Sequence, residues 1–303
     1  MTVVEVAHVS KTFGKPGRRR GGKGSGEVVQ ALRDVSFTVE RGETLALVGE
    51  SGSGKSTLGR ITLRLIEADE GSVKVLGRST RELSRTELRA SRRHMQMIFQ
   101  DPFSSLDQRM VIGDLIAEPM IIHGIEPDAE ARRRRVATLI DRVGLSVRHL
   151  DRFPYEFSGG QLQRVAIARA LATDPQFVVC DEPVAALDVS IRAQVLNLLI
   201  ELQRERGLAY LFISHDLSLV RVLADRVAVI QRGVIVEQGL TDDVYDRPTH
   251  PYTKALLSAV PGRDPERRKL LTSSASSSAR RLPEAAEPAD LPTVADRAAS
   301  GTR

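Results

Sequence analysis

The chain has 303 residues, of which 41% are hydrophobic and 4% aromatic, and its 44 Lys and Arg against 39 Asp and Glu residues give a formal net charge of +5. This length accommodates one large α/β domain with an appendage or two domains. An internal disulfide is excluded because Cys180 is the only cysteine, and no apolar run approaches the roughly 18 residues of a membrane span. The start MTVVEVAHVS also lacks the pattern of a signal peptide, so we expect a soluble or peripheral, cytosolic protein.

The positive charge is concentrated in three clusters of arginine. They are Arg18–Arg20, Arg92 with Arg93, and Arg132–Arg135. Such clusters can bind nucleic acid or an anionic membrane, but they are also typical of solvated helix faces and loops. The charge alone therefore does not decide the function.

The first 40 residues contain two segments in which apolar and polar residues alternate, at 4–6 and 35–39. This period is typical of half-buried strands and predicts an antiparallel sheet. Between them, residues 14–27 are too rich in Gly and Arg to pack, which indicates a mobile basic loop. Phe13 stands just before it, either as an exposed ring that stacks on adenine or as an ordinary core residue.

The stretch GESGSGKST at Gly49–Thr57 fits the phosphate-loop template. It follows the apolar run 44–48, a predicted buried strand, and precedes the helical pattern of residues 58–65. Its glycines let successive N–H groups converge on phosphate oxygens at a helix N-terminus. Lys55 then reaches the β- and γ-phosphates and the Ser56 hydroxyl ligates Mg²⁺. The alternative, a flexible Gly/Ser turn, does not account for the flanking strand and helix.

The middle of the chain is mostly helical. A short strand at 71–77 and a second at 95–99 come first, and Gln100 stands where the second strand opens into a loop. Residues 111–150 then follow a helical pattern, which predicts a helical insertion between two halves of a sheet. Ser158 is a candidate N-cap for the next helix, and its Ser-Gly-Gly run is either a second anion site or common turn chemistry.

Two later strands end in charged residues. The run 177–180 is followed by Asp181 and Glu182, and the run 209–213 leads to His215. At the carboxyl end of parallel strands beside a phosphate loop, Asp181 can hold Mg²⁺ and Glu182 can polarise the attacking water. For Asp181 and Glu182, the alternative is an ordinary acidic turn. His215 is either a structural histidine or, at the end of a third parallel strand, a residue that can reach a γ-phosphate.

The end of the chain contains a predicted hairpin, a short helix and a biased tail. The hairpin covers residues 227–236 and the helix 250–261, which is bounded by prolines. After Gly262 the composition changes to Ser, Ala, Arg, Pro and Glu, which indicates a disordered tail.

Five elements in this order carry a family resemblance: GESGSGKST, Gln100, FSGGQ, VVCDE and the histidine of ISHD. Together they resemble the nucleotide-binding subunit of ATP-binding-cassette (ABC) transporters, over about residues 3–261. The resemblance implies an α/β, P-loop NTPase ABC ATPase fold, with a mixed parallel core sheet, an N-terminal antiparallel β subdomain and an α-helical subdomain. It further implies a nucleotide-binding domain at 1–262, with the helical subdomain at about 103–172 and a C-terminal extension at about 240–262, followed by the tail at 263–303.

The resemblance also implies roles for individual residues. Phe13 is the adenine-stacking aromatic, and Gln100 contacts Mg²⁺ and signals to a membrane partner. Ser158–Gln161 bind the γ-phosphate of ATP held by an opposite subunit, Asp188 belongs to a dimer-contact loop, and His215 is a γ-phosphate switch. The candidate sets are, for catalysis, Glu182, His215, Gln100 and Lys55; for ATP binding, Phe13, Gly49, Glu50, Ser51, Gly52, Ser53, Gly54, Lys55, Ser56, Thr57, Gln100, Ser158, Gly159, Gly160, Gln161, Asp188 and His215; and for Mg²⁺, Ser56, Gln100 and Asp181.

Within the superfamily, the segments IFQDPFSSLD, DEPVAALDVS and especially HPYTKALLSAVP are similar to the ATPases of oligopeptide and dipeptide importers. The chain departs from that group by having no cysteine after the extension, so no iron–sulfur cluster is expected. The resemblance implies an ATP- and Mg²⁺-dependent ATPase on the cytoplasmic face of the cell membrane. Its implied partners are two multi-span permease subunits, an extracytoplasmic solute-binding protein and a second ABC ATPase, which is another copy or a paralogue, with no nucleic acid.

Three alternatives remain open. The cargo can be nickel or glutathione instead of peptides. A soluble ABC ATPase that acts on DNA or ribosomes is a second possibility, for which the basic charge is mild support. A regulatory module without catalysis is the third, and the complete set of Lys55, Gln100, Asp181, Glu182 and His215 argues against it.

Overall fold

The structure is a computed structural model that describes residues 1–14 and 28–259. The predicted basic loop, apart from Gly14, the last residues of the predicted extension and the predicted tail lie outside the described residues. Within this described part, no helix combines the length and the apolar character that a membrane crossing requires.

The N-terminal strands form an antiparallel sheet, as the alternating pattern predicts. Its order is β2-β1-β4-β5. The strands are β1 (Thr2–Phe13), β2 (Val29–Glu40), β4 (Glu70–Val75) and β5 (Arg78–Ser79). In β1, Val6 is buried and pairs with Phe37 of β2 on one side and with Val73 of β4 on the other. The side chains of alternate residues therefore share one buried face.

The central sheet has the order β10-β9-β3-β8-β7-β6. Its strands are β3 (Thr44–Val48), β6 (Met95–Ile98), β7 (Phe177–Asp181), β8 (Ala209–Ser214), β9 (Arg226–Gln231) and β10 (Val234–Leu240). All neighbours pair in parallel except β9 and β10, which form the predicted hairpin. Every residue of β3, β7 and β8 is buried, because helices or the second sheet cover both faces. The mixed parallel sheet is thus confirmed.

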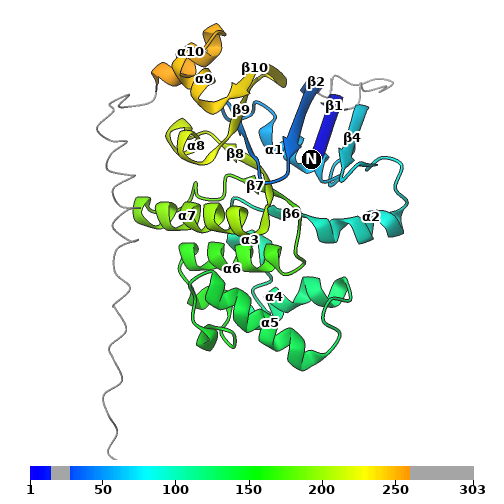
Figure 1. Ribbon diagram of the computed structural model, residues 1–303, viewed down its shortest axis with the longest axis vertical. Coiled ribbons are helices and arrows are strands. Elements are labelled where there is room, and N and C mark those ends of the chain that lie inside the picture. Colours follow the sequence, from blue (N-terminus) through cyan, green and yellow to red (C-terminus); the bar gives the residue numbers. More distant parts are fainter. Residues whose placement is uncertain (15–27, 260–303) are drawn as a thin grey trace, which may run out of the picture. The chain divides into compact units, whose positions relative to one another are not determined.

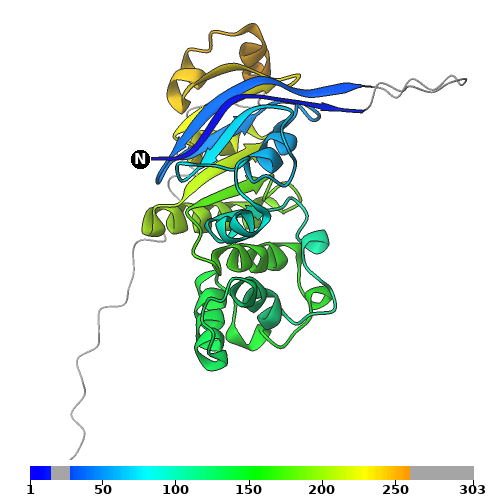
Figure 2. The same ribbon diagram turned by 90° about the vertical axis from the view of Figure 1, so that its right-hand side faces the viewer.

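Helices cover the two faces of this sheet (Figures 1 and 2). They are α1 (Lys55–Thr62), α7 (Val189–Arg206), α8 (Leu217–Leu223), α9 (Thr241–Asp246) and α10 (Pro251–Ser258). Leu58 of α1 packs with Val179 and the antiparallel sheet, whereas Leu199 of α7 packs with Val178 on the opposite face. One prediction was too long: α1 ends at Thr62, and Leu65 is 46% exposed in the turn that follows, where Arg64 has a φ of 49°.

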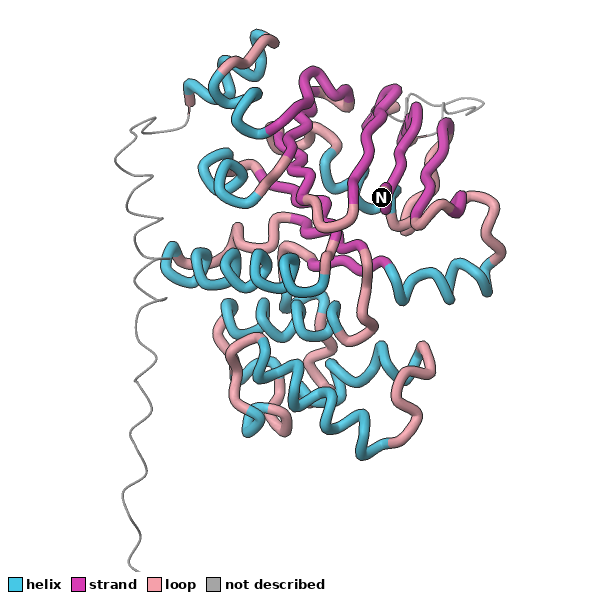
Figure 3. The backbone as a smooth tube through the Cα atoms, in the orientation of Figure 1, coloured by secondary structure: helices cyan, strands magenta, loops and turns pink. Residues whose placement is uncertain are grey.

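The predicted helical insertion is present and forms the lower part of Figure 3. Its helices are α3 (Pro102–Ser105), α4 (Ile112–Ile122), α5 (Ala129–Arg142), η2 (Val147–His149), η3 (Pro154–Glu156) and α6 (Gly159–Leu171), whereas α2 (Arg85–Ser91) and η1 (Arg92–His94) precede β6 and lie outside the predicted insertion. Ile116 of α4, Ile140 of α5 and Val165 of α6 are buried in one core cluster, which continues to the α7 side of the central sheet. This shared core attaches the helices firmly to the strands.

Candidate nucleotide-binding site

The phosphate loop joins the carboxyl end of β3 to the start of α1, as the sequence predicts. Gly52 and Gly54 both have positive φ, at 79° and 105°. A Cβ atom on Gly54 would lie 2.5 Å from the carbonyl oxygen of Ala31, whereas one on Gly52 would meet nothing within 4 Å. Glycine at position 54 is therefore required both by its backbone angle and by the close approach of β2.

These two glycines give a matched test of the loop. Gly52→Ala is expected to lower the free energy of unfolding by about 1 kcal/mol, from the positive φ alone. Gly54→Ala is expected to cost about 3 kcal/mol, because it adds a steric clash with β2 to the same backbone strain. Urea denaturation of both variants measures the difference, and equal losses would contradict the close packing of Gly54.

Lys55 is the buried cation of the loop. It is 5% exposed, and its Nζ donates hydrogen bonds of 2.8 Å to the carbonyl oxygens of Gly49 and Glu50. Burial lowers the pKa of Lys55, although the nearby Glu182 and Asp181 carboxylates act in the opposite direction. The side chain is thus a weakly solvated positive charge, which is suited to binding an anion.

One buried hydroxyl in the loop has no partner. Ser53 is 6% exposed, and its Oγ makes no hydrogen bond within residues 1–14 and 28–259. Buried polar atoms are almost always hydrogen-bonded, so this hydroxyl fits a ligand oxygen. Together with Lys55 and the N–H groups at the start of α1, it makes the loop suitable for phosphate.

Ser56 and Asp181 come together although they are 125 residues apart. The Ser56 Oγ donates a hydrogen bond of 2.8 Å to Oδ1 of Asp181. Burial raises the pKa of Asp181, and the hydrogen bond from Ser56 offsets this only in part. No group of three or more His, Cys, Asp or Glu side chains in the described ranges could hold a metal alone. The hydroxyl and carboxylate oxygens fit Mg²⁺, which commonly combines one or two carboxylates with substrate phosphates.

Glu182 and His215 lie at the ends of neighbouring strands. The pairing of β7 with β8 brings them together, and the backbone N–H of Glu182 donates to Ile213 O at 3.0 Å. The Oε2 of Glu182 is 3.1 Å from Nδ1 of His215. Glu182 also has φ of 49°, which is uncommon for a non-glycine residue and is often found at functional sites.

Gln100 and Phe13 lie at the margins of this cluster. Gln100 is exposed and follows β6, whose Ile98 pairs with Cys180 next to Asp181. Phe13 is the last residue of β1 and is 40% exposed, with the Lys11 Nζ 5.4 Å from its ring centroid. It pairs with Val29 of β2, two residues before the Ala31 that contacts the loop. The ring is therefore partly exposed, as a residue that stacks on a base must be.

The Ser-Gly-Gly run lies at a separate place. Ser158 caps α6, where its Oγ accepts from Gln161 N at 3.3 Å and its own N–H donates to Gln161 Oε1 at 3.0 Å. A Cβ on Gly160 would lie 2.4 Å from Ile191 of α7, so the starts of the two helices touch. Asp188, at the start of α7, is exposed close by. Helices α6 and α1 are well separated in both views (Figures 1 and 2). The candidate ATP-binding residues thus form two sets, one around the phosphate loop and one at the starts of α6 and α7.

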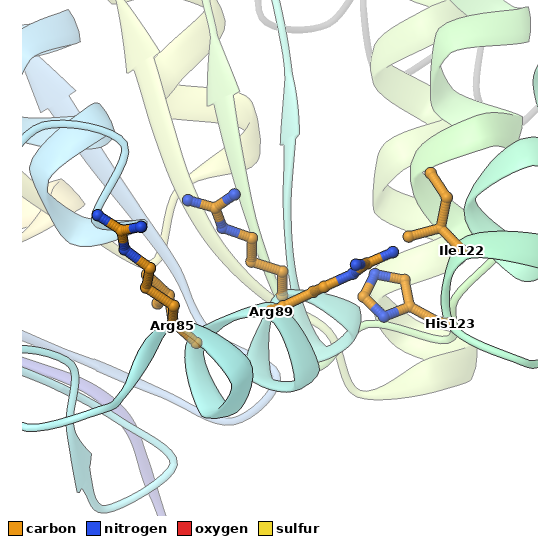
Figure 4. Close-up of a pocket in the computed structure, with 6 residues that line it drawn as sticks. Arg85, Arg89, Ile122 and His123 are labelled. Carbon is orange, nitrogen blue, oxygen red and sulfur yellow. The ribbon is translucent and has the colours of Figure 1, made fainter.

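An open, basic pocket of about 460 Å³ was not predicted from the sequence. It lies between α2 and the end of α4, and Figure 4 shows its lining. The lining residues are Arg85, Leu88, Arg89, Arg92, Ile122 and His123. Arg85, Arg89 and Arg92 form no ion pair with any carboxylate that the structure describes. Burial lowers the pKa of His123, and the charges of nearby arginines lower it further.

Comparison with known proteins places these features in context. The ABC transporter family matches residues 32–185, and the oligopeptide/dipeptide transporter, C-terminal region family matches residues 236–285. The oligopeptide transport ATP-binding protein OppF of Bacillus subtilis (strain 168) is 50% identical over 265 residues, which are 87% of this chain and 84% of OppF. The glutathione import ATP-binding protein GsiA of Escherichia coli (strain K12) is 54% identical over 241 residues, 80% of this chain but 38% of GsiA.

Solved structures show the same fold. The dimeric ATP-binding cassette MJ0796, in a post-hydrolysis state with ADP and Pi, has a TM-score of 0.69 at 30% identity, covering 78% of this chain and 98% of its own. The cbiO1 protein of Clostridium perfringens, part of the ABC transporter complex cbiONQ, has the same TM-score at 25% identity and covers 89% and 99%. The predicted ABC ATPase fold is therefore confirmed.

Proposed function

This chain belongs to the ABC transporter family and is one of its ATPases, and from this premise we propose that it hydrolyses MgATP to drive the import of oligopeptides or dipeptides across the cytoplasmic membrane. The observation that carries the proposal is the convergence of Lys55, Asp181 and Glu182 at one edge of the central sheet. The match of the C-terminal region and the identity to OppF support a peptide cargo.

The chemistry follows from the geometry of that edge. The loop N–H groups and Lys55 bind the β- and γ-phosphates, and Phe13 stacks on the adenine. Ser56, Asp181 and Gln100 would hold Mg²⁺, which neutralises phosphate charge when bound. Glu182 orients the attacking water and accepts its proton.

His215 acts through Glu182 in this arrangement. Its Nδ1 lies 3.1 Å from the Glu182 carboxylate, and 59% of the His215 side chain is exposed, which leaves the ring accessible to a γ-phosphate. A contact to both groups would couple the arrival of the γ-phosphate to the orientation of the base.

Two subunits complete each site. Ser158–Gln161 and Asp188 lie away from the phosphate loop of their own chain, so they bind the ATP held by the opposite subunit. The free N–H groups at the start of α6 suit the γ-phosphate. The similarity to a dimeric cassette supports this arrangement. ATP binding then closes the dimer, and hydrolysis releases it.

The partners follow from the importer role. They are a second ABC ATPase, either a copy or a paralogue, two multi-span permease subunits and an extracytoplasmic solute-binding protein.

The helical insertion docks on a permease subunit at the cytoplasmic face of the membrane. The arginines of the basic pocket, together with Ile122 in its lining and the neighbouring Ile121, which are 47% and 60% exposed, support a docking surface between α2 and the end of α4. Glutathione is the second candidate cargo, because GsiA is 54% identical over the matched region.

Purification from detergent-solubilised membranes tests this proposal. The wild-type chain is expected to recover two multi-span subunits and a second ATPase. The variant Arg89→Glu with Arg92→Glu should lose the multi-span subunits, because its new carboxylates would repel the acidic partner segment that a basic pocket binds. The purified variant should still release phosphate from ATP, since the pocket is outside the nucleotide site.

Charge reversal on α5 is the matched control for that experiment. Arg133 and Arg134 are exposed on a helix outside the pocket, so Arg133→Glu with Arg134→Glu should leave membrane recovery intact. Recovery of ribosomes or DNA by the wild-type chain, with none in the membrane fraction, would contradict the importer role and favour the soluble alternative.

A further inference from the structure

The helix near the end of the described chain touches the phosphate loop directly. The hydroxyl of Tyr252, in α10, accepts a hydrogen bond of 3.1 Å from the backbone N–H of Glu50, the second residue of the loop. These two residues are 202 positions apart in the sequence. The contact uses a loop N–H that would otherwise need another partner.

A carboxylate on β10 fixes the start of α10. Glu237 accepts hydrogen bonds from the N–H and Oγ1 of Thr249, at 2.7 and 2.8 Å, and from the N–H of His250 at 3.1 Å. Burial by itself would raise the pKa of Glu237, but the hydrogen bonds from Thr249 and His250 lower it to about 2. Glu237 is therefore ionised throughout the neutral range, and the attachment of α10 persists there.

The same helix shares a core cluster with the strand that leads into the loop. Leu257 is 5% exposed and belongs to a core cluster with Ala46 and Val48 of β3, against which Tyr252 also packs. Helix α10 thus shares a core cluster with β3 and contacts the second residue of the loop. A shift of α10 would move its tyrosine relative to Glu50.

The Gly49–Glu50 segment is held from two sides. Its carbonyl oxygens accept hydrogen bonds from Lys55 Nζ, and the Glu50 N–H donates to Tyr252. Lys55 would also donate to phosphate, so its hydrogen bonds to these carbonyls can change when a nucleotide binds. The contact with Tyr252 does not depend on Lys55 and continues to fix the loop.

We propose that Tyr252 is a positioning residue for ATP binding, through which the C-terminal extension holds the phosphate loop in its binding conformation. The inference rests on the proposed nucleotide site and adds a determinant of affinity outside it. Tyr252 touches the loop backbone and acts through it. A preorganised loop loses less conformational freedom when the nucleotide binds, so the hydroxyl strengthens binding.

Tyr252→Phe in the full chain removes only the hydroxyl. The dissociation constant of a fluorescent ATP analogue with Mg²⁺ is expected to rise about three- to tenfold, the amount that one net hydrogen bond contributes. The KM for ATP should rise in parallel with little change in kcat. In the nucleotide-free chain, hydrogen exchange of the Glu50 amide should become faster, as measured by mass spectrometry of peptides that cover residues 44–57.

Tyr245→Phe is the matched control, because it makes the same chemical change in the same core cluster. The Tyr245 hydroxyl donates to Leu217 O at 2.5 Å, at the start of α8 and not in the phosphate loop. This variant should lower the unfolding midpoint and leave ATP affinity unchanged. Wild-type affinity in Tyr252→Phe, or an equal loss in Tyr245→Phe, would overturn the proposal. A wild-type chain that binds no ATP would instead refute the proposed function, while the exchange measurement would still decide the Tyr252 contact.

Discussion

Glu182→Gln is expected to bind ATP within about threefold of the wild-type affinity and to lose hydrolysis by about a hundredfold or more. The amide keeps the size and most of the packing of the carboxylate, but it cannot accept the proton of the attacking water. It also leaves the phosphate loop and Lys55 in place. Equilibrium binding and steady-state phosphate release by the full chain measure the two effects separately.

Glu43→Gln makes the same chemical change away from the site. Glu43 precedes β3, at the amino end of the central sheet, where its Oε1 lies 3.1 Å from Nη1 of Arg226. Hydrolysis by this variant should stay at the wild-type rate even if stability falls. If Glu182→Gln retains hydrolysis, another group must be the base.

Lys55→Met is expected to lose ATP affinity itself, by about tenfold to a hundredfold, because a charge-assisted hydrogen bond to phosphate is removed. Folding should be little affected. Burial already disfavours the Lys55 ammonium, as its lowered pKa shows, and a methionine of similar length occupies the space without that penalty. Equilibrium binding measures the loss of ATP affinity, and urea denaturation measures the free energy of unfolding.

Lys74→Met is the corresponding control on β4. The Lys74 Nζ lies 3.2 Å from Oε1 of Glu5, and both side chains are 44% exposed. Such a surface pair contributes little, so binding and stability should both stay near wild type. Unchanged ATP affinity in Lys55→Met would remove Lys55 from the binding role.

Features that depend on local spacing were predictable from the sequence. The phosphate loop is one, because strand, glycines and lysine follow each other within about a dozen residues. The cap of α6 is another, since Ser158 and Gln161 are three residues apart, as a capping box requires. The alternation in β1 and β2 likewise identified the antiparallel sheet.

Features that depend on tertiary pairing were not predictable in this way. The contact of Glu182 with His215 arises because β7 pairs with β8, and a run of strands does not specify their order. The HPYTKALLSAVP segment indicated a family, but nothing in it showed that Tyr252 would reach Glu50. The basic pocket lies between α2 and the end of α4, which β6 and the loop after it separate in the sequence. Its arginines therefore looked in the sequence like ordinary surface charge.

The most direct measurement is ATP-driven uptake of a labelled oligopeptide by vesicles that contain the chain with its co-purified membrane subunits, in the presence of the solute-binding protein. We expect accumulation only when ATP is on the side of this chain, and none with Glu182→Gln. Full ATP hydrolysis without peptide accumulation would contradict peptide import, and undiminished accumulation with Glu182→Gln would contradict the assignment of this chain as the motor.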